Sequence, residues 1–257
     1  MYWLIGLIQG DGYIDDRHIE IYTSSISIAQ HSVKTLKKLH VQKEKIKVDI
    51  YSYISKVKMI SKWSLLLKLP SDNFKLRKNT SPWKSNREKL RIRVASKKLV
   101  TRLKSALNLI KNQKEYVKGL FDAEASVDIK GYIEFKQVAS NSGIKTTLEM
   151  YNIIGKLGIS TTEPKIKNDR NIKKDIYFYV RDLKKYQEEI GFIDIDKKLK
   201  LQKLIKIKEA NKEPSVDKVN KLLKEGKSIW KIMNILRSPY HRIRQIKNNR
   251  LITRQTR

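Results

Sequence analysis

The chain has 257 residues, of which 40% are hydrophobic, enough for an apolar core in one large or two ordinary domains. Lysine and arginine number 57 against 26 aspartates and glutamates, and the resulting formal charge of +31 favours a polyanionic partner, most simply nucleic acid. The lack of cysteine excludes disulfides and thiolate zinc sites, and no apolar run or signal sequence points to a membrane or to secretion, so we expect a soluble intracellular protein.

A short apolar segment near the start of the chain occurs a second time near its middle. Residues 4–12 read LIGLIQGDG and residues 117–125 read VKGLFDAEA, and each predicts a helix with two small residues four positions apart. Such residues share one face of a helix, so two of these helices can pack almost backbone to backbone. The small residues are Gly6 and Gly10 in the first segment and Gly119 and Ala123 in the second.

One acidic residue follows each pair of small residues, Asp11 in the first segment and Glu124 in the second. Close packing of the two helices would bring these carboxylates together, where they repel each other unless a proton or a cation intervenes. Carboxylate oxygens are the ligands that hold Mg²⁺ beside substrate phosphates. One apolar run of this kind is more often an ordinary core helix, but two copies with an acid at the same offset favour a divalent-metal site.

Between the two copies, the pattern predicts strands and helices in alternation. Residues 12–30 predict two strands, with a turn at Asp15-Asp16-Arg17 and with alternation continuing through Ile26 and Ile28. The polar faces of such strands can be solvated or can read base edges in the major groove. The later elements of this repeat are a helix through Val33, Leu36 and Leu39, a hairpin at Lys45–Tyr53 and Val57–Leu69, a long basic loop at Pro70–Lys89, a strand at Leu90–Ala95 and a helix capped by Ser96.

The second copy restarts the same order of elements, which indicates a duplication with a period of about 110 residues, too long for a solenoid. Two related halves create a pseudo-symmetry that suits a pseudo-palindromic DNA target. The predicted elements are a strand at Tyr132–Gln137, a helix at Leu148–Leu157 that ends at Gly158, strands at Thr161–Lys167 and Asp175–Val180, and a helix at Arg181–Ile190.

The composition changes from about residue 209. Between Glu213 and Arg257, twelve lysines and arginines stand against three acids, and apolar residues form three short clusters at helical spacing. The last two clusters predict a helix-turn-helix-like module with Pro239–Lys247 as its basic recognition helix. A basic tail that folds only on contact is the alternative, but the apolar clusters favour a folded module. We therefore expect domains at residues 1–111, 112–208 and 209–257.

The two repeated segments resemble the signature motif of the LAGLIDADG homing endonucleases, with Asp11 and Glu124 at the catalytic position. Gln9 and Gly10 depart from the consensus Asp-Ala, and Ala125 departs from its final Gly, while the catalytic position is kept. The resemblance covers about residues 1–208. It implies an α+β fold of two pseudo-symmetric halves, each with an antiparallel, saddle-shaped sheet, packed through the motif helices.

The resemblance also implies a set of site residues. Asp11 and Glu124 would bind Mg²⁺, with Gly10 and Ala123 beside them as further ligands. Gln30 and Gln137 would be the polar residues that order water or the scissile phosphate, and Lys198, or its neighbour Lys197, would be the basic residue. The residues expected to contact DNA are Tyr22, Ser27, Lys47, Arg77, Lys84, Arg91, Arg93, Lys136 and Lys165 in the repeats, and Arg242, Arg244 and Lys247 in the C-terminal module.

The activity that the resemblance implies is site-specific double-strand DNA cleavage by a monomer, across the minor groove of a long pseudo-palindromic target. Two alternatives stay open. An intron RNA maturase could use the same fold to bind RNA without cleaving DNA. A non-catalytic DNA-binding regulator is the other, and loss of the two acids would favour it, whereas both acids are present here.

Overall fold

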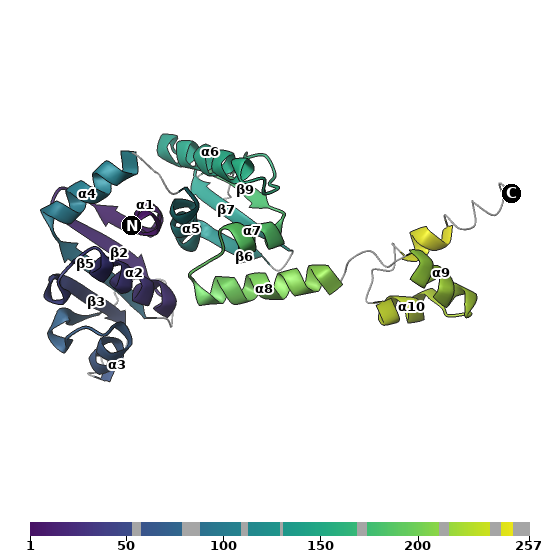
Figure 1. Ribbon diagram of the computed structural model, residues 1–257, viewed down its shortest axis with the longest axis horizontal. Coiled ribbons are helices and arrows are strands. Elements are labelled where there is room, and N and C mark those ends of the chain that lie inside the picture. Colours follow the sequence, from purple (N-terminus) through teal and green to yellow (C-terminus); the bar gives the residue numbers. More distant parts are fainter. Residues whose placement is uncertain are drawn as a thin grey trace. The chain divides into compact units, whose positions relative to one another are not determined.

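The computed structural model describes residues 1–52, 58–78, 88–108, 113–128, 131–168, 174–210, 216–236 and 243–248 (Figure 1). The chain forms two compact units, Met1–Leu201 and Gln202–Arg257. The first unit contains both motif helices and two β-sheets, and the expected α+β class is confirmed. Within the described residues, no helix is long and apolar enough to span a membrane.

The first repeat forms a five-stranded sheet in the order β1-β2-β5-β3-β4. Its neighbouring strands are antiparallel except β3 and β4, which are parallel and so depart from the wholly antiparallel sheet that the resemblance implied. The elements are α1 (Tyr2–Asp11), β1 (Gly12–Ile14), β2 (His18–Thr23), α2 (Ile26–Lys38), β3 (Ile46–Ser52), α3 (Lys58–Leu67), β4 (Phe74–Lys78), β5 (Lys89–Ala95) and α4 (Lys97–Asn108), with short 3-10 turns at Lys43–Lys45 and Ser71–Asn73.

The second repeat forms a four-stranded antiparallel sheet in the order β6-β7-β9-β8. Its buried face carries Phe135 and Phe178, which lie opposite each other on β7 and β9 and pack against Phe121 of the motif helix. The elements are α5 (Gln113–Glu124), β6 (Ala125–Asp128), β7 (Tyr132–Val138), α6 (Asn141–Lys156), β8 (Lys165–Asn168), β9 (Lys174–Val180), α7 (Leu183–Glu189) and α8 (Ile195–Ala210).

The segment at Ile26–Gln30 is the first part of helix α2, so the expected strand there is wrong. Ser25 caps this helix by accepting a hydrogen bond from the backbone N–H of Ile28 at 3.5 Å. The alternating Ser-Ile-Ser-Ile letters resemble a strand, but the buried residues Ile28, Val33 and Leu36 follow helical spacing. The serine cap and the helical spacing of the buried residues therefore decide for a helix here, against the strand that the short alternation predicted.

The segment at Val57–Leu69 also differs from the expected hairpin strand, because residues 58–67 form helix α3. Trp63 and Leu67, four residues apart, are both buried. Parallel strands need a crossover connection, usually a helix, and α3 lies in the connection between β3 and the parallel strand β4. Strand β4 in turn occupies part of the stretch that we expected to be a loop, Pro70–Lys89, of which residues 79–87 lie outside the described residues.

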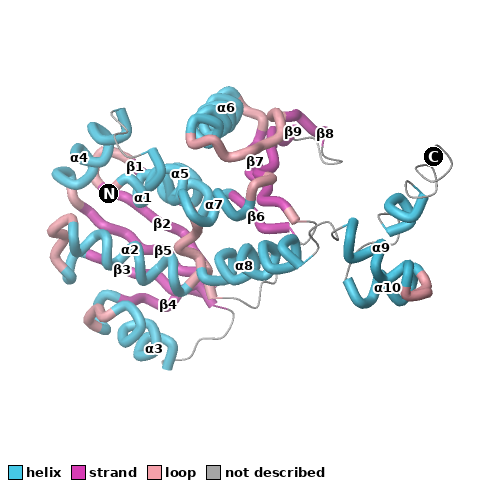
Figure 2. The backbone as a smooth tube through the Cα atoms, turned by 45° about the vertical axis from the view of Figure 1, so that its right-hand side comes forward, coloured by secondary structure: helices cyan, strands magenta, loops and turns pink. Residues whose placement is uncertain are grey.

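Helices α1 and α5 lie side by side and join the two repeats (Figures 1 and 2). A Cβ atom placed on Gly119 would lie 1.9 Å from the carbonyl oxygen of Trp3, and one placed on Gly6 would lie 2.1 Å from that of Tyr116. At each crossing point, the backbone of one helix therefore touches a residue that has no side chain. We call this contact the glycine seam.

Two hydrogen bonds cross the glycine seam, and they are related to each other by the pseudo-symmetry of the two repeats. The indole Nε1 of Trp3 donates to Oδ2 of Asp122 at 2.8 Å, and the hydroxyl of Tyr116 donates to Oε1 of Gln9 at 2.6 Å. In each bond, an aromatic residue at the start of one helix reaches a polar residue near the end of the other. These bonds fix how far one helix can slide along the other, because each joins a set position on one helix to a set position on the other.

The second unit contains α9 (Val216–Lys224), α10 (Ile229–Leu236) and a further helical turn over 243–248. Val219, Ile232 and Ile243 come from these three helices and form one buried cluster. Gly226, with φ +74°, makes the turn after α9, and Ser228 accepts a hydrogen bond from the backbone N–H of Lys231. Three short helices with a common core are what a folded module, rather than a tail, would show.

We predict that Gly119→Ala separates the seam and lowers the free energy of unfolding by about 1–3 kcal/mol, the usual cost of overpacking a tight contact. Gly155→Ala is the matched control, because Gly155 lies within helix α6 and a Cβ atom there would meet nothing within 4 Å. That control should be neutral or up to about 1 kcal/mol more stable, since alanine favours helices. Urea unfolding of both variants tests this, and equal stabilities would contradict the seam.

Candidate functional site

The site is the place where the C-terminal ends of α1 and α5 meet, with one carboxylate on each. A Cβ atom on Gly10 would lie 3.0 Å from Cγ and 3.3 Å from Oε1 of Glu124, so little space separates the two helix ends. Burial raises the pKa of Asp11, and burial together with the charge of Asp11 raises the pKa of Glu124. The glycine seam therefore holds two partly desolvated carboxylates close enough to repel each other.

Lys197 is the cation at this site. Its Nζ donates to the carbonyl oxygens of Asp122 at 2.6 Å, Phe121 at 3.2 Å and Ala123 at 3.5 Å, in the last turn of α5. A lysine at such a position satisfies carbonyls that lack helical partners and balances the negative end of the helix dipole. Burial lowers the pKa of Lys197, and the surrounding carboxylates, including Asp11 and Glu124, oppose that shift.

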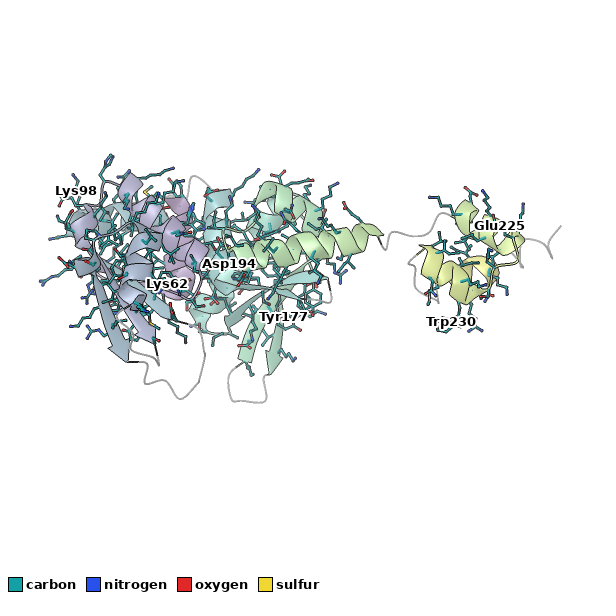
Figure 3. All side chains as sticks on the ribbon, turned by 90° about the horizontal axis from the view of Figure 1, so that it is seen from below. Lys62, Lys98, Tyr177, Asp194, Glu225 and Trp230 are labelled. Atoms are coloured by element: carbon teal, nitrogen blue, oxygen red, sulfur yellow. The ribbon has the colours of Figure 1, made fainter. Side chains whose placement is uncertain are left out.

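The position of Lys197 depends on a chain of hydrogen bonds that starts at Asp122. The carboxylate of Asp122 accepts from the backbone N–H groups of Ile193 and Asp194, both at 3.0 Å to Oδ1. Asp194, labelled in Figure 3, in turn caps the start of α8 by accepting from the backbone N–H of Lys197 at 3.1 Å. The second copy of the motif thus fixes the end of helix α8 that carries the lysine.

The two lysines expected near the site have different surroundings. Lys198 is exposed, whereas Lys197 is largely buried beside the carboxylates. The sequence holds a signal that could have separated them. Asp194 precedes the helix as a cap, so the third helical residue, Lys197, faces back toward the capping residue, and the next residue turns away.

The two glutamines expected beside the acids are not equivalent. Gln137, on β7, makes a side-chain hydrogen bond to Glu124. Gln30 lies on helix α2, where its Nε2 donates to the carbonyl oxygen of Leu66 at 3.1 Å. Strand pairing places Gly12 opposite Ile21 and Ala125 opposite Phe135, so the residue equivalent to Gln137 in the first repeat is Thr23.

The acidic pair fits a magnesium ion on the chemistry of its donors. Asp11 and Glu124 offer carboxylate oxygens, and burial raises the pKa of both while the charge of Lys197 opposes the rise. Gly10 and Ala123 precede them in the two helices. Among the described residues, no group of three or more histidines, aspartates and glutamates could hold a metal. Magnesium often uses only one or two carboxylates and completes its shell with water and phosphate, so two acids suffice.

Five of the residues expected to contact DNA lie on one face of the five-stranded sheet. Strand pairing puts them on the same face, and the residue before or after Tyr22, Lys47, Arg91 and Arg93 is buried in the core on the opposite face. Carboxylates also lie on this polar face: Asp49 pairs with Arg91 and, at 3.3 Å, with Arg77. The five residues are Tyr22, Lys47, Arg77, Arg91 and Arg93.

The other expected contacts are scattered over the chain. Lys136 and Lys165 are exposed on β7 and β8, and Lys136 pairs with Asp175 at 3.1 Å. Ser27 instead accepts a hydrogen bond from the backbone N–H of Ile195 at 3.1 Å and so contacts the start of α8. Arg244 and Lys247 are exposed in the second unit, whereas Lys84 and Arg242 lie outside the described residues.

Several solved structures are similar to this chain at low sequence identity. One of mesophilic variants of the homing endonuclease I-DmoI matches 74% of this chain and 93% of that chain, with a TM-score of 0.46 and 20% identity. The structure of I-DmoI in complex with DNA and Mn matches 74% of this chain and 94% of that chain, with a TM-score of 0.45 and 21% identity. The structure of full-length DUF199/WhiA from Thermatoga maritima matches 88% of this chain and 65% of that chain, with a TM-score of 0.47 and 14% identity. The sequence matches no protein-family model and no curated protein.

We predict a pH dependence of stability that comes from Asp122. Burial raises the pKa of this carboxyl from 3.8 to about 6, so between about pH 4 and about pH 6 the folded chain keeps a proton that the unfolded chain has lost. Its contribution is therefore present at low pH and disappears as the pH rises. The free energy of unfolding of the wild type, relative to Asp122→Asn, should fall by about 3 kcal/mol over this interval. Urea unfolding at several pH values measures the difference, and a constant difference would be inconsistent with the shift.

Proposed function

We propose that this chain is a site-specific endonuclease that cuts both strands of a long DNA duplex with the help of divalent metal ions, as homing endonucleases do. The observation that carries the proposal is the meeting of Asp11 and Glu124 at the ends of α1 and α5, beside the buried Lys197. Two partly desolvated acids held together at a cost in repulsion are unusual in a structural contact and typical of a site that binds a cation.

Each acid comes from one repeat, so the site is built to treat two related strands alike. Asp11 and Glu124 would hold the metal ions, with the backbone of Gly10 and Ala123 beside them. Magnesium, when bound there, would supply an activated water and balance the charge of the scissile phosphate. Gln137, which already bonds to Glu124, can hold that carboxylate in place and order a water molecule.

Lys197 contributes a positive charge that does not depend on a metal ion. Three backbone carbonyls of α5 hold its ammonium group in a fixed position near both acids. A fixed charge in a partly buried site stabilises negative charge that develops on a phosphate during hydrolysis, with no reorganisation at the moment of reaction. The described residues of the first repeat include no equivalent of this lysine. Lys197 would therefore either assist the cutting of both DNA strands or favour the cutting of one.

The polar face of the five-stranded sheet and the exposed lysines of the second sheet are the proposed duplex-binding surfaces. Arg91 and Arg93 offer the planar donors that pair with guanine edges, and Lys47 offers a point charge for phosphate. Two repeats within one chain suit a monomer on a pseudo-palindromic target. The third domain, residues 209–257, would then be a helix-turn-helix-like module that adds contacts on one side, with the two halves at 1–111 and 112–208.

The acids give the first test. Asp11→Asn and Glu124→Gln should abolish magnesium-dependent cutting of a pool of randomised duplexes, and neither change should lower the free energy of unfolding, because each removes a repelling charge. Glu188→Gln, an exposed carboxylate on α7, is the matched control and should cut normally. Full cutting by either acid variant would refute the assignment, and duplex binding without cutting by the wild type would favour the regulator.

The neighbouring lysines give a second, internally controlled test. Lys197→Gln should slow single-turnover cutting by about 10²–10³-fold, the usual loss for one preorganised group that stabilises charge. Lys198→Gln removes the same charge one residue away and should cut at nearly the wild-type rate. Equal effects of the two changes would mean that only the net charge matters and that the buried lysine has no special role.

The C-terminal module gives a third test. Truncation after Ala210 should reduce the slope of log affinity against log salt by roughly 4, if four or five of its cations meet phosphate at about 0.9 per contact. The footprint should shorten at one end, and cutting at saturating enzyme should persist, because the acids are untouched. An unchanged slope and footprint would show that the module does not bind the duplex.

A further inference from the structure

A second candidate site lies between helix α2 and the C-terminal end of α3, within the first unit. It is a cavity of about 620 Å³, inside the range of about 300–1,000 Å³ that small-molecule sites occupy. Four lysines line it: Lys34, Lys37 and Lys38 from α2, and Lys68 from the turn after α3. We call it the lysine pocket. None of the residues proposed for duplex contact lines it.

The charge of the lysine pocket is not balanced from within. The residues that line it include no carboxylate, and within the described part of the chain the side chains of Lys34, Lys38 and Lys68 make neither an ion pair nor a hydrogen bond. Burial, with the charges of Lys43 and Lys68, lowers the pKa of Lys37. Lys34, Lys38 and Lys68 are exposed around the cavity and Lys37 is half-buried. Like charges gathered in this way repel one another, and a bound anion would relieve that repulsion.

The walls of the pocket are fixed by contacts between the two helices. Nζ of Lys37 donates to the carbonyl oxygen of Lys68 at 3.0 Å and to that of Leu67 at 3.5 Å. Gln30 donates to the neighbouring carbonyl of Leu66 at 3.1 Å, which holds its side chain at this pocket. These bonds satisfy carbonyls at the end of α3 and tie that end to α2. The remaining three ammonium groups stay available to a ligand.

The equivalent helix of the second repeat lacks such a cluster. Helix α6 follows β7 as α2 follows β2, but on α6 the exposed Lys145 stands four residues before Glu149 and attracts that carboxylate. On α2 the same spacing joins two lysines, Lys34 and Lys38. The lysine pocket is therefore a feature of one repeat and does not follow from the duplicated fold.

We infer that the lysine pocket binds a nucleotide, whose phosphate oxygens accept hydrogen bonds from the lysines and whose nucleoside packs against the apolar side chain of Leu66. Leu66 lines the cavity and is partly exposed, and the buried Val33 and Leu67 also line it, so the apolar floor between the charged groups includes surface that a ligand can cover. Ammonium groups are common point-charge partners of phosphate. The nucleotide is either free in solution or an unpaired residue of a bound strand, since both present the same phosphate and nucleoside.

Titration calorimetry on the full chain, at about 0.15 M ionic strength to screen exposed charges, tests the inference with three probes: ADP, pyrophosphate and a short oligo(A) RNA. ADP should bind at one site and more tightly than pyrophosphate, because only ADP covers the floor. Lys34→Gln with Lys38→Gln should weaken ADP binding at least tenfold, which is about 1.4 kcal/mol. Lys145→Gln with Lys156→Gln, two exposed lysines on α6, removes the same charge and should leave ADP binding nearly unchanged.

The probes also separate the two sources of the ligand. A free nucleotide is the ligand if ADP competes fully with the RNA at this pocket, and a strand residue is the ligand if the RNA binds far more tightly than ADP and loses affinity only in the α2 variant. Equal weakening by both double variants, or equal affinity for ADP and pyrophosphate, would overturn the inference. Duplex cutting should be the same in all variants, so failure here is distinct from failure of the proposed nuclease function.

Discussion

The close approach of α1 and α5 is the contact on which the rest of the first unit depends. Gly6 and Gly119 allow the backbone of each helix to touch the other, and no residue with a side chain could take their places without a shift. Because the two acids follow directly after the seam, the distance between the helices decides the distance between the carboxylates. The fold thus keeps Asp11 and Glu124 close together although their charges repel, and the packing of the rest of the fold offsets that cost.

The duplication is incomplete where the chemistry is concentrated. The pairs Trp3–Asp122 and Tyr116–Gln9 are pseudo-symmetric versions of one interaction, but of the two acceptors only Asp122 is ionisable and only Asp122 connects onward to the start of α8. That connection brings Lys197 to the acids, and the first repeat offers no such helix among its described residues. The fold is therefore pseudo-symmetric, but the site that it carries is asymmetric. The lysine pocket on α2 is a second asymmetric feature.

The motif that is repeated far apart in the sequence predicted the fold better than short local alternations of apolar and polar residues did. The repeated motif, with small residues and an acid at fixed offsets, was enough to predict the helix pair and the approach of Asp11 to Glu124, and the resemblance of that motif to a known family implied the α+β class. Five letters of alternation at Ile26–Gln30 were not enough, because a serine cap and a buried helical face decided that segment. The parallel pair β3–β4 depends on contacts between residues far apart in the chain, which no local pattern reports.

Locating bound metal ions shows directly whether Asp11 and Glu124 form a metal site. Crystals of the full chain with a cleaved duplex and Mn²⁺, measured at the manganese absorption edge, would show each bound ion as a peak of anomalous scattering. We expect peaks between Asp11 and Glu124, within coordination distance of both carboxylates and next to a phosphate of each strand. Peaks bound elsewhere, or a fully loaded crystal with none at the end of the glycine seam, would contradict this metal site.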